Sequence, residues 1–398
     1  MAEQGETVED WATDWDHHDP VWVQNPYPIW NELRDRCPVA HTDRYNEGTW
    51  LPLRFDDLSQ IAHDTESFSS QHDGLTAGGT VDRVRFPPIH SDPPEHQPLR
   101  RAVLPFFSPK RIAAWEPVLR EHCEALMTSI VARGGGDAAV DYAQHIPVTA
   151  IAAILGVDPA DGDQFRTWVV DFIEVGARDN DVRERATVEL LAYMRRAMER
   201  RQAAPSDDLI SHLLGSEVDG QQLDDDTIER MLMLQLVAGI DTTWSSIGAA
   251  LWHLATNDGD RRRLAAEPDL IPTAVEEFLR AYAPVNVIRR VAQRTTVNGV
   301  AMHPGDSVLM TFPIACRDPE MFERHDEVII DRQRNRHPAF GLGIHRCLGS
   351  NLARLEMNVA VATWLEHAPE FGLAQGAEVR WSEGQIRGPR TIPVVIGR

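Results

Sequence analysis

Residues 340–349 read FGLGIHRCLG and run directly into a helix-forming segment that begins at Ser350. Cys347 therefore precedes a helix start, where backbone N–H groups stabilise the thiolate form that binds metals. Phe340 can shield the sulfur, and His345 can reach an anionic group of a bound cofactor. A single thiolate without a second sulfur suits haem iron better than zinc or an iron–sulfur cluster. The glycines of the stretch, which let the backbone lie against a flat cofactor, are Gly341, Gly343 and Gly349.

The alternative interpretation of this stretch is a buried structural cysteine in a glycine-rich turn. Five positions of the stretch carry the pattern, and at average residue usage they coincide in fewer than about one in a million windows. We therefore interpret Cys347 as a metal ligand. The five positions are Phe340, Gly343, His345, Cys347 and Gly349.

The whole chain has the composition of a globular protein, with 398 residues of which 42% are hydrophobic and 25% charged. Its formal charge of −22 argues against nucleic acid or an anionic membrane as a partner. No run approaches the ~20 apolar residues that cross a bilayer, and the acidic N-terminus lacks the features of a signal peptide. We expect a cytoplasmic protein with one domain over residues 1–398, in which residues 1–20 are a candidate disordered tail. The other cysteines are scattered, which argues against a disulfide framework.

Helical periodicity dominates from about Pro98 to His367, whereas the alternation typical of strands is confined to short pieces. One piece covers Val297–Met310, with Asn298-Gly299 as a hairpin turn, and another covers Thr391–Ile396. Glycines and prolines interrupt residues 69–94, and a loop of this length is a candidate substrate lid. These patterns predict a mainly α fold with small β-sheets.

The longest predicted helix spans Asp226–Asn257, which corresponds to about 48 Å at 1.5 Å per residue. Residues 236–243 at its centre read LVAGIDTT. A glycine inside a helix costs about 1 kcal/mol, and an acid beside two threonines is unfavourable there. Such defects indicate either a functional groove or a bulge filled by side-chain hydrogen bonds.

The cysteine stretch resembles the cysteine loop of the cytochrome P450 family, F-x-x-G-x-H-x-C-x-G, and other motifs of that family follow in the expected order. Glu277 and Arg280 resemble its E-x-x-R helix, and Arg332 would complete the buried ion network of the family. On its own, E-x-x-R would more simply be a solvated surface pair. The resemblance extends over nearly the whole chain, from Asn25 to Arg390, and implies a single-domain cytochrome P450 fold shaped like a triangular prism.

The resemblance implies haem b as the cofactor, with Cys347 as the axial ligand of its iron. The two haem propionates are carboxylates that need cationic or donor partners inside a protein. The residues that match the family's propionate contacts are His96, Arg100, Arg290 and His345, and those that match its haem-plane contacts are Phe340, Gly341, Gly349, Ala238 and Gly239.

Asp241 and Thr242 match the family's A-G-x-[DE]-T segment. The resemblance implies that Gly239 opens a groove for dioxygen, that Thr242 hydrogen-bonds the reduced oxygen, and that Asp241 feeds protons from solvent. Family members that use peroxide directly on fatty acids typically lack the acid–threonine pair. Its presence favours a route that uses dioxygen and two electrons.

We therefore expect a haem-thiolate monooxygenase that hydroxylates, or O- or N-dealkylates, a largely apolar small organic molecule. The chain shows no flavin or iron–sulfur module, so we expect electrons from a separate ferredoxin or flavodoxin with an NAD(P)H-dependent reductase; the alternative is that the sequence is one part of a longer fusion. A monomer is expected. The alternatives are peroxygenase, coupling or isomerisation chemistry on the same haem, or a non-catalytic haem sensor. Basic residues that would dock the acidic redox partner are Lys110, Arg111, Arg332, Arg334, Arg336 and Arg346.

The substrate pocket is expected, by correspondence with the family, to have mostly aliphatic and aromatic walls. Asn286 and Arg387 would orient a polar group of the substrate. The predicted wall residues are Leu75, Val84, Phe86, Phe172, Val237, Val285, Asn286, Val287, Ile288 and Ile386.

Overall fold

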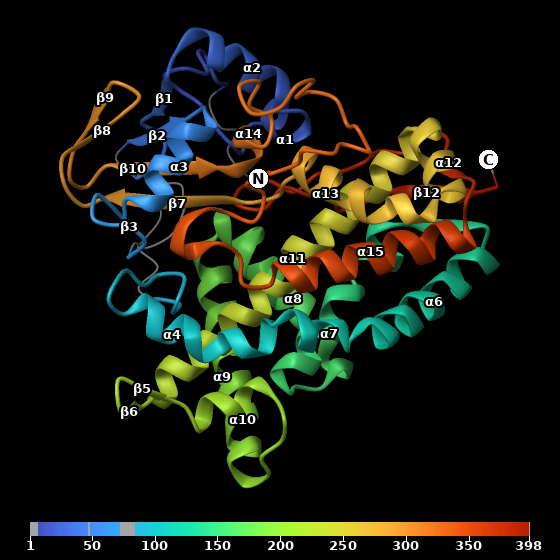
Figure 1. The fold of residues 1–398 in the computed structure, drawn as a ribbon, viewed down its shortest axis with the longest axis horizontal. Helices are drawn as coiled ribbons and strands as arrows, with labels where there is room; N and C mark the ends of the chain where they lie inside the picture. Colours follow the sequence, from blue (N-terminus) through green and yellow to red (C-terminus); the bar gives the residue numbers. More distant parts are fainter. Residues whose placement is uncertain (1–6, 47, 72–83, 398) are drawn as a thin grey trace.

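The computed structural model describes residues 7–46, 48–71 and 84–397. Helices make up most of it, and its outline is roughly triangular (Figure 1). The α-helices of these residues are α1 (Pro20–Gln24), α2 (Tyr27–Arg36), α3 (Phe55–His63), α4 (His96–Val103), α5 (Pro109–Ala113), α6 (Glu116–Ala132), α7 (Ile146–Leu155), α8 (Gly162–Ile173), α9 (Asn180–Ala203), α10 (Leu209–Leu214), α11 (Asp225–Thr256), α12 (Asp258–Ala266), α13 (Ile271–Ala281), α14 (Phe312–Ala315) and α15 (Ser350–His367).

The strands are short and form small sheets, as the sequence predicted. They are β1 (Val39–Thr42), β2 (Thr49–Pro52), β3 (Phe68–Ser69), β4 (Gly135–Asp137), β5 (Glu217–Val218), β6 (Gln221–Gln222), β7 (Asn286–Val291), β8 (Thr295–Val297), β9 (Val300–Met302), β10 (Ser307–Thr311), β11 (Phe371–Leu373) and β12 (Pro393–Ile396). The mainly α fold with small sheets is confirmed.

The long central helix α11 begins where local chemistry favours it. The side chain of Asp224 accepts a hydrogen bond from the backbone N–H of Thr227, and Asp225 and Asp226 lie in the first turn, where negative charge is stabilised by the helix dipole. The helix has 32 residues and packs against α7, α9 and α15. Figure 1 shows it crossing the molecule through the helical layer. The predicted helix over 226–257 is confirmed to within one residue at each end.

The largest sheet has the strand order β1-β2-β10-β7-β3. Strand β7 runs antiparallel to β10, with Ile288 opposite Leu309. The separate hairpin β8–β9 turns at Asn298 (φ 46°) and Gly299 (φ 81°), as the Asn-Gly pair predicts. Strand β12 lies between β11 and β4 in a second sheet and confirms the predicted C-terminal strand.

The N-terminal segment corrects one expectation. Residues 7–20 do not form a disordered tail, because Trp15 is 0% exposed and packs with Trp22, Trp30 and Ile288 in one apolar cluster. Indole rings bury a large apolar area, so a few of them can order a short acidic segment that has little helical or strand pattern of its own.

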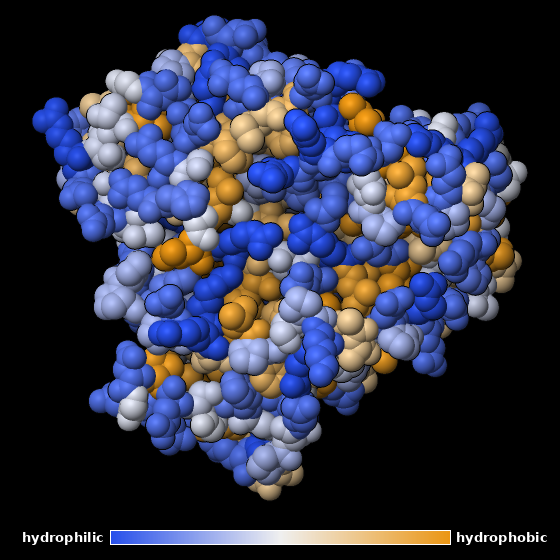
Figure 2. All heavy atoms as spheres, viewed as in Figure 1, coloured by the Kyte–Doolittle hydropathy of each residue, from blue (hydrophilic) through white to orange (hydrophobic). Residues whose placement is uncertain are grey.

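No helix in the described part of the chain is long and apolar enough to cross a membrane. On the face of the molecule seen in Figure 2, hydrophilic side chains predominate, and hydrophobic side chains gather toward the middle of that face.

Candidate active site

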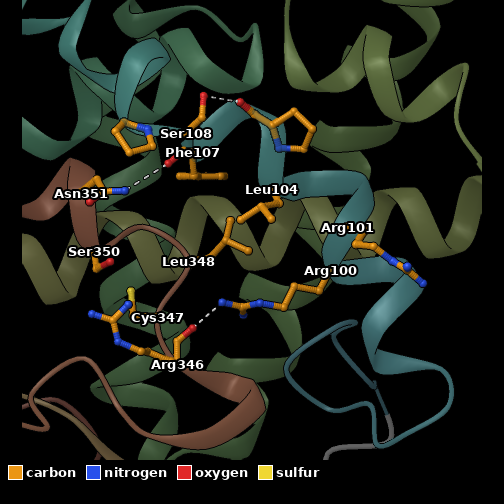
Figure 3. Close-up of a pocket in the computed structure, with 12 residues that line it drawn as sticks. Arg100, Arg101, Leu104, Phe107, Ser108, Arg346, Cys347, Leu348, Ser350 and Asn351 are labelled. Carbon is orange, nitrogen blue, oxygen red and sulfur yellow. Dashed lines mark hydrogen bonds between the residues drawn. The ribbon is translucent and has the colours of Figure 1, made fainter.

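Cys347 lies in a tight loop directly before α15. Its backbone N–H donates to the Phe340 carbonyl (2.7 Å), and the turn requires Gly343, since a Cβ there would lie 2.1 Å from the Ala62 carbonyl oxygen at a φ of 64°. Cys347 is exposed and borders a cavity of about 490 Å³ (Figure 3). The opposite wall of the cavity comes from α4 and the residues after it, including Arg100 and Leu104.

The thiol of Cys347 is surrounded by protein apart from this cavity. Burial raises its pKa, and the Gly349 N–H and the charge of Arg100 oppose that rise. A metal deprotonates a coordinating thiol outright. The loop therefore presents a sulfur that is suited to a metal rather than a reactive free thiolate.

Cationic and donor groups converge beside the cysteine loop, and none of them forms an ion pair within the described residues. The His96 ring is 3% exposed and lies 4.4 Å from the His345 ring, and among the described residues its Nε2 has no hydrogen-bond partner. The Nε2 of His345 lies 2.9 Å from Ser70 Oγ. Arg100 donates to the Arg346 carbonyl. Burial, with the positive charges of Arg289, His96 and Arg100, lowers the pKa of His345 to about 2.

Arg289 belongs to this group, and its neighbour Arg290 does not. Successive side chains of a strand point to opposite faces. Arg289 is 8% exposed and makes no ion pair within the described parts of the chain, and burial lowers its pKa to about 10. Arg290 instead donates to the Gly305 carbonyl (2.7 Å) and to Ser307 Oγ (3.0 Å) on the other face of β7. The expected propionate contact at Arg290 is therefore corrected to Arg289.

These features fit a flat cofactor that carries two carboxylates. A buried arginine without a carboxylate and a buried imidazole without a partner are costly unless an anion joins them. Ala238 is exposed and Thr242 is half-exposed, although both lie at the centre of α11, where most residues are buried. Exposed positions at the centre of α11 and at Cys347 are the two surfaces that a bound haem would cover.

Gly239 has a packing role that the sequence did not reveal. A Cβ on this residue would lie 3.0 Å from Ile151 of α7. The glycine thus permits close contact between α11 and α7, in addition to any space that it leaves for dioxygen.

Asp241 and Thr242 lie differently from the sequence expectation. Asp241 is 2% exposed and forms an ion pair with Arg390, 2.8 Å away, instead of facing solvent. Burial raises the pKa of Asp241, and Arg390 opposes this rise. The Thr242 hydroxyl donates to the Ala238 carbonyl (2.7 Å), one helical turn earlier. Solvent therefore has no direct access to the carboxylate in this conformation.

The residues of the E-x-x-R motif come together in a buried network. Glu277 accepts two hydrogen bonds of 2.8 Å from Arg280, and both side chains are 0% exposed. Arg332 donates to the same carboxylate (2.9 Å) and is 9% exposed. The network joins α13 to the segment that precedes the cysteine loop. Because its side chain is used here, Arg332 is not available for docking a partner, contrary to the expectation from sequence.

The predicted pocket residues divide into those that remain candidates for the pocket wall, described first, and those that the structure places elsewhere. Phe86 and Phe172 form an edge-to-face pair with ring centroids 5.7 Å apart, and Val285 bridges to Ile386. Val84 and Val287 are half-buried and Val237 is buried. Leu75 lies outside the described residues, as does much of the predicted lid.

Asn286 and Ile288 correct the prediction, because they lie on the face of β7 that points away from the cysteine loop. Asn286 donates to the Gly384 carbonyl (3.1 Å), and Ile288 packs in the cluster of Trp15. Arg387 donates to the Val23 and Gln24 carbonyls (3.0 Å each), so it holds the N-terminal segment rather than a substrate.

Comparison with known proteins agrees with this site. The profile of the family described as cytochrome P450 matches residues 171–368. The mycinamicin IV hydroxylase/epoxidase of Micromonospora griseorubida is 32% identical over 383 residues, covering 92% of this chain and 94% of that protein. The vitamin D(3) 25-hydroxylase of Pseudonocardia autotrophica is 34% identical and covers 94% of each chain. The solved structure of CYP109E1 from Bacillus megaterium in complex with testosterone superposes with a TM-score of 0.85, at 29% identity over 94% of this chain and 98% of that one.

The fold, the cysteine loop and these matches define an oxidoreductase that depends on haem. The chain belongs to the cytochrome P450 family and is a monooxygenase.

Sequence reasoning missed two residues of the site, Arg289 and Arg390. For Arg289 the sequence offered only the alternation of side chains along a strand, which places Arg289 and Arg290 on opposite faces without showing which face meets the cysteine loop. Arg390 is distant from Asp241 in sequence, and no local pattern connects them.

Proposed function

We propose that this cytochrome P450 inserts one atom of dioxygen into a largely apolar small organic molecule, by hydroxylation or by O- or N-dealkylation. The observation that carries the proposal is the exposed Cys347 in its glycine-rich loop, beside cationic and donor groups that form no ion pair within the described residues. Bound haem b would supply the activation of dioxygen with two electrons.

Each residue of the site has a role in this proposal. Cys347 would ligate the iron, and the glycine-rich loop would lie along the haem on that side with Phe340, Gly341 and Gly349. Ala238 and Gly239 would lie along the opposite side. The propionates would pair with His96, Arg100, Arg289 and His345, which supplies each buried cation or donor with the anion that it lacks.

Asp241 and Thr242 would move the protons that oxygen reduction consumes. Thr242 is half-exposed on α11, and its hydroxyl would turn from the Ala238 carbonyl toward the bound haem. Asp241, the next residue, would restore that proton once its carboxylate is free of Arg390. This acid–threonine pair favours the dioxygen route over peroxygenase chemistry or a sensor without catalysis.

The substrate would be apolar and bulky. The described walls are Phe86, Phe172, Val237, Val285, Val287 and Ile386, which offer shape and apolar contact rather than a charge clamp. The relatives named for mycinamicin IV and vitamin D3, and the structure with bound testosterone, point to ring systems of similar character.

Electrons would come from a separate acidic ferredoxin or flavodoxin. Arg334, Arg336 and Arg346 are exposed near the cysteine loop, as is Lys110, in a protein whose net charge is −22. Arg111 contributes less to such a surface, because it pairs with Asp207 (2.8 Å). Reduction by an acidic partner should slow steeply with added salt.

The deciding experiment is a titration of the ferric haem protein with mycinamicin IV, vitamin D3 and testosterone, followed by the haem absorption band. A shift to the high-spin form would identify the substrate class, and product analysis with a surrogate ferredoxin and reductase would then show the inserted oxygen. A carbon monoxide difference spectrum without the thiolate-type band would contradict the assignment of Cys347. Reductant consumed without an oxygenated product from any bound compound would contradict the monooxygenase proposal for that class.

A further inference from the structure

Arg387 lies in a C-terminal turn, residues 381–389, whose two arms are joined by the hydroxyl of a buried serine. Ser382 Oγ donates to the Ile386 carbonyl (2.8 Å) and accepts from the Gly388 N–H (2.9 Å). The Ser382 side chain is buried, so water does not compete for these bonds. The turn therefore behaves as one unit, and a displacement of Arg387 is passed to its neighbour Ile386.

The C-terminal turn holds Ile386 against the start of β7. Ile386 forms an isolated β-bridge with Val285, the residue before the strand. On either side of this bridge, the Asn286 N–H donates into the turn (2.9 Å) and the Arg387 N–H donates back to the segment before β7 (2.8 Å). Val285 and Ile386 are both candidate wall residues of the substrate pocket, so the place of the turn affects the shape of that wall.

The Arg387 side chain points from the C-terminal turn to the N-terminal segment, residues 15–27. Its Nε donates to the Val23 carbonyl and its Nη2 donates to the Gln24 carbonyl (3.0 Å each). These are the last two residues of α1, and carbonyls at the end of a helix have no partner inside it. The guanidinium also lies over the Trp381 ring, 4.0 Å from its centroid. Arg387 thus ties the turn to the end of α1.

A second contact joins the N-terminal segment to the other arm of the C-terminal turn. Arg178 donates both to Glu383 and to the His18 carbonyl (3.3 Å), and His18 Nδ1 lies 3.5 Å from Glu383. A Cβ on Gly384 would lie 3.1 Å from the His18 ring. The N-terminal segment therefore meets the turn both before and after Ile386.

The N-terminal segment is itself fixed to the main sheet. Trp15, Trp22 and Trp30 are 0%, 3% and 2% exposed, and they pack in one cluster with Ile288 of β7 and Leu309 of β10. Close-packed interiors have low compressibility and transmit strain. The cluster is thus a firm support for the contacts that the segment makes with the C-terminal turn.

We propose that Arg387 is a positioning residue that sets the place of Ile386 in the pocket wall, so that the N-terminal segment takes part in substrate selection through the C-terminal turn. The inference rests on the proposed monooxygenase function, which makes Ile386 a wall of the substrate pocket. Without the guanidinium, the turn keeps its Ser382 bonds but loses its attachment to α1, and Ile386 is free to withdraw from a bound molecule. A gap of about 0.5–1 Å at an apolar contact removes roughly a quarter to a half of its attraction.

The first test titrates the ferric haem protein with imidazole, 1-butylimidazole and 1-octylimidazole, followed by the haem absorption band. Each ligand binds iron through its ring nitrogen, and its chain reports on the apolar walls, because each methylene that they bury tightens binding by up to about fourfold. Arg387→Met should bind imidazole as the native protein does. Its gain in affinity from imidazole to 1-octylimidazole should be about tenfold smaller. A gain that is unchanged or larger would overturn the proposal.

Two further variants separate positioning from a general loss of stability. Arg261→Met is the matched control, because Arg261 in α12 also donates to a backbone carbonyl and lies over an aromatic ring, that of Phe371. It should leave the affinity gain unchanged even where the free energy of unfolding falls. Ile386→Ala should lower the gain by itself, and adding Arg387→Met should lower it no further, because Arg387 acts through Ile386. Additive losses would contradict this coupling.

The second test is hydrogen exchange of the ferric protein without a ligand, which reports directly on the attachment. In Arg387→Met, the amides of Asn286 and Asn25, which donate into the C-terminal turn and within α1, should exchange at least about tenfold faster. The amides of β12, which follows the turn, should exchange as in the native protein. Unchanged exchange at Asn286 would overturn the proposal, as would an equal increase in β12, which would show that the whole fold had been destabilised.

Failure of this inference is distinguishable from failure of the proposed function. A native protein whose affinity does not rise with chain length would remove the apolar pocket of the proposed function, while the exchange result on the turn would stand. A normal rise in the native protein with the same rise in Arg387→Met would remove only the role of Arg387.

Discussion

Two buried arginine–carboxylate networks in this molecule differ in how completely they are satisfied. In the network of α13, Glu277 also accepts from the Ile329 N–H (2.8 Å) and from Asn335 (3.1 Å), while Arg280 donates to the carbonyls of Cys316, His325 and Glu327. In the network of α11, Asp241 and Arg390 lie close together but are poorly aligned. A fully bonded network fixes one conformation, whereas a partly bonded one can exchange partners at low cost. The network of α13 is therefore structural, whereas the network of α11 is suited to a step in which side chains exchange partners.

The largest loss of stability should come from breaking the fully hydrogen-bonded network of Glu277. Glu277→Ala leaves Arg280 and Arg332 without their carboxylate in a buried site, and this should lower the free energy of unfolding by about 3–5 kcal/mol. Urea unfolding of the haem protein measures this loss in the free energy of unfolding. Arg324→Ala, which breaks an exposed pair with Glu327, is the control and should cost less than about 1 kcal/mol. Similar losses in both variants would remove the distinction between the networks.

Asp241→Asn should lower turnover strongly and stability only slightly, the opposite of what we expect for Glu277→Ala. Turnover with an identified substrate should fall about 100-fold because the proton donor is lost, while stability changes little because Arg390 retains Glu174 and Ser245. The ratio of product to NAD(P)H consumed and the urea midpoint report the two effects separately. A large loss of stability with intact coupling would instead make this network structural as well.

The same comparison applies on the two faces of β7. Arg290 already has two acceptors, whereas among the described residues the Arg289 side chain donates to the carbonyl of the preceding residue, Ile288, alone. Arg289→Gln should therefore weaken haem retention by about tenfold, the equivalent of one charge-assisted hydrogen bond, and Arg290→Gln should have little effect. Transfer of haem to apomyoglobin measures the rate of loss. A greater effect at Arg290 would restore the original assignment.

A half-buried carboxylate provides the smallest expected effect. Burial opposes ionisation of Glu276, but hydrogen bonds from His337 and Arg354 hold its pKa at about 2, below the ordinary value of 4.5. A lowered carboxyl pKa stabilises the folded state above the ordinary value, and this contribution is lost as the pH falls from about 4.5 toward 2. Glu276→Gln should therefore flatten the acid side of the stability curve, measured by urea unfolding between pH 3 and pH 7. An unchanged curve would show that this pair contributes nothing.

The parts of this protein that sequence predicted are those with local causes. The cysteine loop, the Asn298-Gly299 turn and the start of α11 follow from glycine conformations, turn chemistry and capping. The parts that it missed depend on tertiary contact. The order of the N-terminal segment comes from a tertiary cluster in which Trp15 and Ile288 both pack, and the ion pair of Arg390 with Asp241 comes from a close approach at Gly388 and Gly248.

Strand β7 has a consequence for how substrate preference can evolve in this enzyme. One face of the strand carries Val287 and Arg289, which we propose to border the haem, whereas on the other face Ile288 packs with the N-terminal tryptophans and Asn286 donates to the Gly384 carbonyl. A change of side-chain volume at Val287 alters the pocket and leaves the tryptophan cluster in place. The same change at Ile288 must be accommodated by indole rings that have no free space. Mutational tolerance along this strand should therefore alternate residue by residue, and selection for new substrates can act on only every second position.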